Sequence, residues 1–385
     1  MTMPDPVALA QALIRCPSVT PTDAGALGVL EGALKPLGFV CHRLSFGEPG
    51  SDRIENLYAR MGTQAPLFCF AGHTDVVPPG GRWKNDPFGA EIRDGVLYGR
   101  GAADMKAAIA AFAAAAARVM AKDVPGSIAL LITGDEEGEA VNGTRKVLAW
   151  MKENGERLDH CIVGEPSSAA AVGDRIKIGR RGSLNVRVTV KGVQGHVGYP
   201  AKARNPIPAL AMLATRLSER KLDDGSDHFE PSTLSFTSID VGNPANNVIP
   251  AEARAQFNIR FNDRHTPETL TALIDGEAKS VAKRTGCEIA LEHSLSGTAF
   301  LTKPGKFTEL VAKAVASVTG RLPEFSTTGG TSDARFIQDF CPVAELGLPG
   351  ATMHKTDECV AVADIARLAD VYVAVLDAYF KHPPR

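Results

Sequence analysis

Residues 127–138 are SIALLITGDEEG, a largely apolar run followed by three consecutive acids between two glycines. A shorter apolar run occupies residues 67–71 and is followed directly by Gly72 and His73. Continuous apolar runs of this length are typical of strands in a parallel sheet that is buried on both faces. Ligands bind such sheets at the carboxyl ends of their strands. The two stretches therefore predict an α/β fold with a polar site at that edge of the sheet.

Helices and strands alternate outward from these two stretches. Further apolar strands are predicted at residues 160–163 and 343–346, and helices at residues 105–120, 144–152, 306–318 and 363–380. This alternation favours a mostly parallel sheet with helices on both faces. We assign that domain to residues 1–179 and 295–385.

The middle of the chain has a different pattern, because its strands alternate between apolar and polar residues, as half-exposed strands do. Strands are predicted at residues 183–191, 233–241, 253–261 and 288–295, and helices at residues 206–220 and 266–284. The order β-α-β-β-α-β matches the ferredoxin-like unit. We therefore expect an inserted ferredoxin-like domain at residues 180–294.

Composition excludes several classes of protein. The chain has 385 residues, which suggests about two domains, and its formal net charge of −2 argues against a nucleic-acid or membrane-surface partner. No apolar run approaches the roughly 20 residues of a membrane-spanning helix. Asp5 followed by Pro6 predicts the start of a helix rather than a signal peptide. The 7 cysteines form no C-x-x-C pair, which favours reduced thiols in a cytoplasmic protein.

Side chains that bind divalent metals occur repeatedly where predicted strands end. The candidate ligands are His73, Asp104, Glu137, Glu165 and His354. Each one alone is more often a loop residue or a helix cap. Together they are harder to explain as surface residues, because acids that follow buried strands repel each other unless cations are present. We therefore predict a site for two divalent ions of the zinc type, which activate water for hydrolysis.

Two neighbouring residues have roles that follow from their spacing. Asp75 lies two residues after His73, on the same side of an extended segment, and is expected to accept a hydrogen bond from the second imidazole nitrogen. Glu136 precedes Glu137 and points elsewhere, which suits a general base. Asp104 is the best candidate for a carboxylate shared by both ions.

These motifs resemble the family of co-catalytic zinc peptidases and amidohydrolases that includes aminoacylase, carboxypeptidase G and acetylornithine deacetylase. The resemblance extends over essentially the whole chain. Four further segments match one narrower group within it: residues 182–190, Gly195-His196-Val197-Gly198-Tyr199-Pro200, residues 246–252 and Thr328-Gly329-Gly330-Thr331-Ser332-Asp333-Ala334-Arg335-Phe336. That group usually has Asn four residues before the last metal-ligating His, where this chain has Gly350.

The resemblance implies how the metal centre is divided. His73 and Glu165 would hold one ion, Glu137 and His354 the other, and Asp104 would bridge the two ions. The peptide bond between Asp104 and Met105 would be cis. Zinc is the implied metal, and cobalt suits the same ligands. Glu136 would take a proton from the attacking water and return it to the leaving amine.

The resemblance also implies that the inserted domain is a lid that forms a homodimer. His196 would come from the partner chain to stabilise the oxyanion. From the residues alone, His196 is equally well explained as a loop histidine in a glycine-rich turn.

The substrate implied is a small molecule with three carboxylates, N-succinyl-L,L-2,6-diaminopimelate, whose linear amide would be hydrolysed. Such a substrate needs cationic and N–H-rich partners. The resemblance assigns these roles to Lys177, Arg180, Tyr199, Asn246, Arg260, Gly330, Thr331 and Ser332. Two alternatives remain: a hydrolase for another N-acyl amino acid, like acetylornithine deacetylase, and a non-catalytic homologue that binds metal or peptide.

Overall fold

The computed structural model describes residues 3–122 and 124–384. The chain divides into two compact units. The first comprises Met1–Ile178, Thr302–Ser326 and Ser332–Arg385, and the second comprises Gly179–Leu301 and Thr327–Thr331. The second unit extends beyond residues 180–294 because β16 (Phe300–Leu301) pairs with β9 (Gly179–Arg180). The side chain of Thr327 also donates to the carbonyl of His228 within this unit.

The first unit is built on an 8-stranded sheet with the order β1-β2-β6-β3-β7-β18-β8-β17. Its central strands are β6 (Ser127–Thr133), β3 (Leu67–His73), β7 (His160–Val163) and β18 (Val343–Glu345), which are parallel. Every residue of β3 and β6 is buried. The prediction of a parallel α/β sheet is confirmed for this central part.

The edges of the sheet contain strands that the sequence did not predict. The strands β1 (Val40–Phe46) and β2 (Ile54–Met61) are antiparallel additions on one side. On the other side, β8 (Arg175–Lys177) is antiparallel to β18 and pairs with β17 (Glu324–Ser326). A smaller sheet of the same unit contains β4 (Ile92–Arg93), β5 (Val96–Tyr98) and β19 (Cys359–Ala361).

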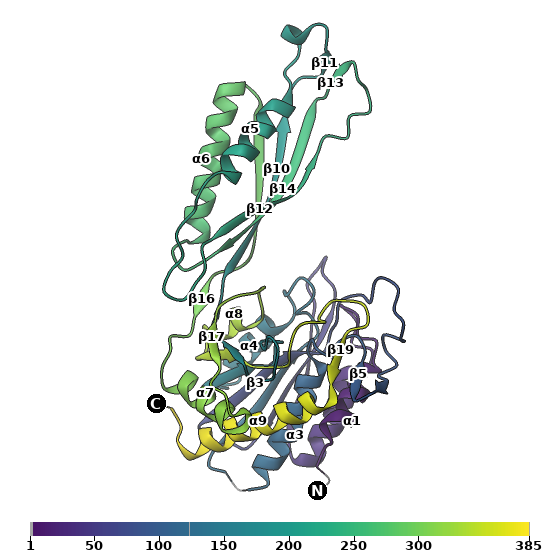
Figure 1. Cartoon of the computed structure of the whole chain (residues 1–385), viewed down its shortest axis with the longest axis vertical. Helices are drawn as coiled ribbons and strands as arrows, with labels where there is room; N and C mark the ends of the chain where they lie inside the picture. Colours follow the sequence, from purple (N-terminus) through teal and green to yellow (C-terminus); the bar gives the residue numbers. More distant parts are fainter. Residues whose placement is uncertain (1–2, 123, 385) are drawn as a thin grey trace. The chain divides into compact units, whose positions relative to one another are not determined.

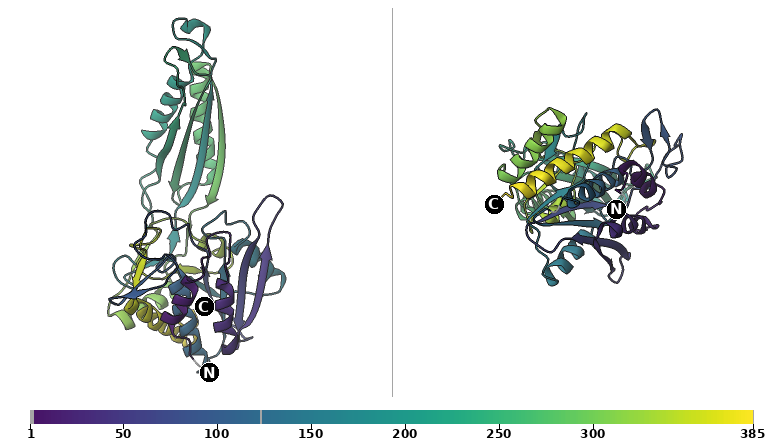
Figure 2. Two further views of the ribbon diagram at one scale, coloured as in Figure 1. Left: turned by 90° about the vertical axis from the view of Figure 1, so that its right-hand side faces the viewer. Right: turned by 90° about the horizontal axis from the view of Figure 1, so that it is seen from below.

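Helices cover both faces of the large sheet (Figure 2). One layer contains α1 (Pro6–Ile14), α3 (Lys106–Met120), α7 (Lys306–Thr319) and α9 (Val362–Lys381), which contact one another. The opposite layer contains α4 (Thr144–Glu153) and the short α8 (Ala334–Ile337). A further helix, α2 (Ala26–Leu34), contacts α1 and β2. The alanine-rich α3 is almost wholly buried, because small side chains let α1 and α9 approach it closely.

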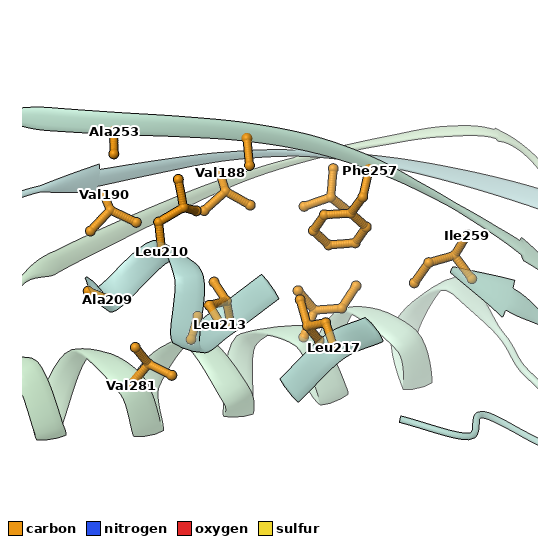
Figure 3. Close-up of a cluster of buried hydrophobic side chains, with 14 of the residues drawn as sticks. Val188, Val190, Ala209, Leu210, Leu213, Leu217, Ala253, Phe257, Ile259 and Val281 are labelled. Atoms are coloured by element: carbon orange, nitrogen blue, oxygen red, sulfur yellow. The ribbon is translucent and has the colours of Figure 1, made fainter. Parts of the chain in front are cut away.

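The second unit is a four-stranded antiparallel sheet with two helices on one face (Figures 1 and 3). Its strands, in spatial order, are β12 (Thr233–Asp240), β14 (Glu252–Phe261), β10 (Gly182–Lys191) and β15 (Glu288–Gly297). The helices are α5 (Pro206–Ser218) and α6 (Pro267–Thr285). Val188, Leu213 and Phe257 contribute to the core between sheet and helices. The predicted order of elements in the ferredoxin-like domain is confirmed.

Two short strands of the second unit, β11 (Gly195–His196) and β13 (Val248–Ile249), are far apart in the chain and pair in antiparallel fashion. None of the helices in the described part of the chain is long and apolar enough to cross a membrane. Asp5 is the N-cap of α1, as predicted, and its carboxylate accepts a hydrogen bond from the amide of Val7.

Candidate metal centre

Neighbouring strands of the first unit bring the predicted ligands together at one edge of the sheet. His73 is the last residue of β3, which lies between β6 and β7. Glu137 follows the end of β6, and Glu165 follows the end of β7. Because these three strands are parallel, their carboxyl ends meet at the same edge. His354 reaches the site from the segment between β18 and β19.

Asp104 is positioned by close packing between the start of α3 and two glycines. It precedes Met105, and the peptide bond between them is cis. A Cβ atom on Gly72 would lie 2.5 Å from Met105 Cε, and one on Gly164 would lie 2.6 Å from the same atom. The absence of side chains at the ends of β3 and β7 therefore lets the start of α3 lie directly against these strands, with Asp104 beside His73.

This packing makes Gly164→Ala a sensitive test of the site's support. The added methyl would overlap Phe70 Cζ and Met105 Cε, and overpacking of this kind costs about 1–3 kcal/mol. We expect weaker metal binding as well, because Met105 and Asp104 would move together. Denaturant unfolding and metal titration measure the two effects.

Gly276→Ala is the matched control, because nothing lies within 4 Å of a Cβ atom at that helical position. It is expected to leave the metal affinity unchanged. A Gly164→Ala protein with the stability and metal affinity of the parent would contradict this account of the packing.

The ligand atoms form two groups that share Asp104. His73 Nε2 lies 3.4 Å from Asp104 Oδ1 and 3.7 Å from Glu165 Oε1. His354 Nε2 lies 3.1 Å from Asp104 Oδ2 and 2.8 Å from Glu137 Oε1. Asp104 thus presents one carboxylate oxygen to each histidine, as a shared ligand must.

The donor set fits divalent cations. His73 Nε2 and Asp104 Oδ1 are buried and have no hydrogen-bond partner among the residues that the structure describes. Ligand atoms of His73, Asp104 and Glu137 all lie within 4.8 Å of one another, as do those of His73, Glu136 and Glu165. Imidazole nitrogens with carboxylate oxygens are the ligands of zinc-type ions, and a cation would satisfy the atoms that lack partners.

The electrostatics of the site agree with this interpretation. Loss of hydration and the nearby Glu165 carboxylate raise the pKa of Glu136 well above its usual value. Hydrogen bonds to Asp104 and Glu137 raise the pKa of His354 to about 10. Acids held this close together repel one another, and divalent cations relieve that repulsion.

The structure corrects one detail of the prediction for Asp75. His73 Nδ1 lies 2.9 Å from the backbone oxygen of Asp75, whereas the carboxylate Oδ1 is 3.7 Å away. The carboxylate instead accepts hydrogen bonds from the amides of Glu136 and Glu137, at 3.3 Å and 3.1 Å. The amides of this acidic loop hold the carboxylate, which lies just beyond the end of β3 at His73. Asp75 therefore orients His73 through its backbone and the acidic loop through its side chain.

Two predicted substrate residues belong to the first unit. Lys177 is the last residue of β8 and is buried. Ser332 is also buried, and its hydroxyl donates to Glu345 Oε1 at 2.5 Å.

The remaining predicted residues fall into two groups within the second unit. Arg180 Nη1 donates to the carbonyl of Gly330, which precedes Thr331, at 3.1 Å. Arg260 pairs with Ser183 near the start of β10, at the same end as Arg180. A nitrogen of Arg260, Nη1, is buried and has no hydrogen-bond partner in residues 3–122 and 124–384.

The second group is found at the opposite end of this unit, around β11 and β13 (Figure 1). The rings of His196 and Tyr199 are 5.7 Å apart, and Asn246 lies just before β13. Tyr199 and Asn246 are exposed. The ten-residue strand β10 separates this group from Arg180 and Arg260, a length of roughly 30 Å. Within one copy of the second unit, the two groups are therefore not brought together.

Sequence reasoning missed Glu358 and Arg100, whose side chains are in contact in the interior of the first unit. Arg100 belongs to a glycine-rich segment whose composition is unusual for a surface loop. Glu358 has no comparable sequence signal, because it follows Asp357 in a polar segment where an acidic pair is ordinary.

Known proteins provide an independent comparison. Residues 69–378 match the model of peptidase family M20/M25/M40. A protein of Rhodospirillum centenum named succinyl-diaminopimelate desuccinylase is 60% identical over 381 residues, which cover 98% of both chains. A protein of the same name from Rhodospirillum rubrum is 58% identical over 393 residues, covering 99% of this chain and 100% of the relative.

Solved structures share the fold at lower identity. The aminopeptidase PepT of Bacillus cereus has a TM-score of 0.78 and 22% identity, over 98% of this chain and 99% of that one. The YXEP protein of Bacillus subtilis, described as a dinuclear metal binding peptidase of the M20 family, has a TM-score of 0.71 and 16% identity, over 97% of this chain and 96% of that one.

Proposed function

Because the chain belongs to peptidase family M20/M25/M40, we propose that it hydrolyses N-succinyl-L,L-2,6-diaminopimelate to succinate and L,L-2,6-diaminopimelate. This reaction is a step in the synthesis of lysine and cell-wall precursors. The observation that carries the proposal is the 60% identity over 98% of both chains with a protein named for this activity. The grouped ligands and Glu136 support amide hydrolysis as the chemistry.

The metal-binding residues divide between two ions, for which zinc is the proposed identity and cobalt an acceptable substitute. His73 and Glu165 would hold one ion, Glu137 and His354 the other, with Asp104 shared. When bound, such ions lower the pKa of water and polarise the carbonyl of the scissile amide. Asp75 keeps His73 and the Glu136-Glu137 loop in place.

Glu136 is the general base. Its carboxylate lies within 4.8 Å of ligand atoms of His73 and Glu165, where it can accept a proton from the attacking water. The same carboxyl group then returns that proton to the nitrogen of the leaving amine, so that the amide C–N bond breaks and a neutral amine departs. The cycle therefore needs no proton from any other side chain of the protein.

The substrate's three carboxylates suit the charges and donors of the predicted binding residues. Lys177, Arg180 and Arg260 provide positive charge, and Tyr199 and Asn246 provide hydrogen bonds. The segment from Gly330 to Ser332 offers backbone N–H groups. The buried Arg260 Nη1 without a partner in the described residues is a donor that a substrate carboxylate would satisfy.

The active form is proposed to be a homodimer through the second unit. His196, Tyr199 and Asn246 are separated from Arg180 and Arg260 by the length of β10. A partner chain placed in the opposite direction would supply the distant group to complete the site. His196 of that partner would then stabilise the oxyanion of the tetrahedral intermediate.

Mixing two inactive variants tests this exchange. One chain carries Glu136→Gln and the other His196→Ala. If His196 acts in the partner's site, a mixed dimer has one site with both residues intact, and roughly a quarter of the parent activity returns on random mixing. If both residues serve the same chain, every site in the mixture is defective. Activity no higher than the sum of the separate variants would contradict the proposed dimer.

A second candidate substrate class is favoured by Gly350. The narrower group that the sequence resembles has Asn there, so one substrate contact is missing or comes from another residue. This leaves an N-acyl-amino-acid hydrolase of the acetylornithine deacetylase type as the alternative. A non-catalytic homologue is less compatible with the sequence, because the five predicted metal ligands and the general base Glu136 are all present.

Paired assays decide between these functions. The proposed enzyme is expected to hydrolyse N-succinyl-L,L-diaminopimelate roughly 10⁴-fold more efficiently than N-acetylornithine, because the acetyl group leaves carboxylate-binding residues unsatisfied. The reverse preference would assign the alternative substrate class, and hydrolysis of neither would contradict both. The 7 cysteines are free, which is compatible with the proposed cytoplasmic location.

A further inference from the structure

The carboxylate of Glu358 is fully buried beside the metal centre and is surrounded by donors. Its Oε1 accepts hydrogen bonds from the amides of Ala103 and Asp104, at 2.9 Å and 3.0 Å. Its Oε2 accepts from the amide of Gly101 at 3.2 Å and from Arg100 Nη1 at 2.7 Å. One carboxylate thus determines the path of the segment that carries the shared ligand Asp104.

Arg100 connects the same carboxylate to the segment that carries His354. Its Nη1 also donates to the carbonyl of Lys355, the residue directly after His354, at 3.2 Å. Its Nη2 donates to the carbonyl of Pro79 at 3.0 Å. Its guanidinium carbon lies 5.2 Å from the centre of the Trp83 ring. Arg100 is only 2% exposed, so its charge depends on Glu358 for compensation.

The His354 segment needs such support. His354 has a φ of 61° and Asp357 a φ of 55°, values in the left-handed region that residues other than glycine rarely adopt. Such conformations persist when the surrounding structure determines them. The backbone of Glu358 contributes as well, because its carbonyl accepts from the amide of Gly99 at 2.9 Å.

From these contacts we propose that Glu358, with Arg100, is a positioning residue that holds Asp104 and His354 where they bind the metal ion between Glu137 and His354. We call this ion the second metal ion. This inference rests on the proposed metal centre. The ion between Glu137 and His354 depends on both supported segments. The ion between His73 and Glu165 depends on only one of them, because those two ligands come from the ends of β3 and β7.

Glu358→Gln is the principal test, with zinc alone as the probe. The amide oxygen of Gln still serves Ala103 and Asp104, but its NH₂ group faces two donors, those of Gly101 and Arg100. We expect the second equivalent of zinc to bind about 10–100-fold more weakly, as is usual when a residue behind a ligand is lost. The first equivalent should change much less. Calorimetric titration of metal-stripped protein measures both steps.

Cobalt gives a spectroscopic signature that a purely structural role would not alter. In the parent, the visible absorption of Co²⁺ should rise with each of two equivalents, whereas in Glu358→Gln the second increment should require excess cobalt. Arg100→Lys keeps the charge but loses the forked contacts to the carbonyls of Lys355 and Pro79, so it should shift the second step in the same direction. If Glu358→Gln does not fold, the double variant Glu358→Gln/Arg100→Met removes both buried charges and is expected to show the same weak second step.

Glu156→Gln is the matched control. The Glu156 carboxylate accepts hydrogen bonds from Arg60 and Tyr58. It lies near Leu67, where β3 begins, and Leu158, just before β7, and so at the end of these strands opposite the metal ligands. Its replacement should lower thermal stability without changing either metal-binding step.

The outcomes separate this inference from the proposed function. Parent-like binding of both ions by Glu358→Gln overturns the positioning role, even if the parent releases succinate. A weakened second step supports the role even if the parent proves inactive on the succinylated substrate, because the readout needs no substrate.

Discussion

Glu136→Gln is expected to lower kcat by about 10²–10⁴-fold or more while both metal ions remain bound. Gln has nearly the same shape but cannot accept the proton of the attacking water. The amide of residue 136 would still donate to Asp75, so the acidic loop should keep its position. The expected effect is therefore on the chemical step and not on the assembly of the site.

Steady-state kinetics and metal analysis of the same preparation test this prediction together. Glu139→Gln is the matched control, since Glu139 is an exposed acid on the same loop and should leave kcat unchanged. If Glu136→Gln retained both ions and full activity, the proposed role of Glu136 would be wrong.

Asp104→Ala is expected to have the other large effect, on metal binding itself. Asp104 is the residue whose two oxygens face the two different histidines. Loss of a residue behind a ligand already costs about 10–100-fold in affinity, and loss of a shared ligand should cost more. We expect at most one tightly bound ion and no measurable turnover at stoichiometric zinc.

Asp370→Ala is a suitable control for this variant, because Asp370 is an exposed acid that pairs with Arg118 on the surface. Metal content after dialysis, measured for both variants, gives the comparison. Two ions retained by Asp104→Ala would mean that Asp104 is not shared between them.

The central strands were predictable because their physical signal is local. Residues 127–133 and 160–163 are largely apolar runs, and the observed strands have the same bounds. The edge strands gave no such signal. In β1, polar residues such as His42 and Arg43 lie on a partly exposed strand, and its pairing with β2 depends on contacts that a local pattern does not contain.

The candidate metal ligands were predictable for a related reason, since they follow the ends of strands that the sequence reveals. The supporting residues were not. Glu358 acts on residues about 250 positions earlier in the chain, and its burial arises only when the two segments meet. The change in the acceptor for His73 has a similar cause, because the Asp75 carboxylate is held by amides 61 and 62 positions later in the chain.

The most direct test of the whole account is succinate release from N-succinyl-L,L-diaminopimelate by metal-stripped protein, measured while zinc is added. The account predicts no turnover without metal and activity that rises until two equivalents of zinc per chain are bound. Full turnover by the metal-free protein would contradict the proposed mechanism. Tight binding of two zinc ions with no succinate release would contradict the proposed substrate.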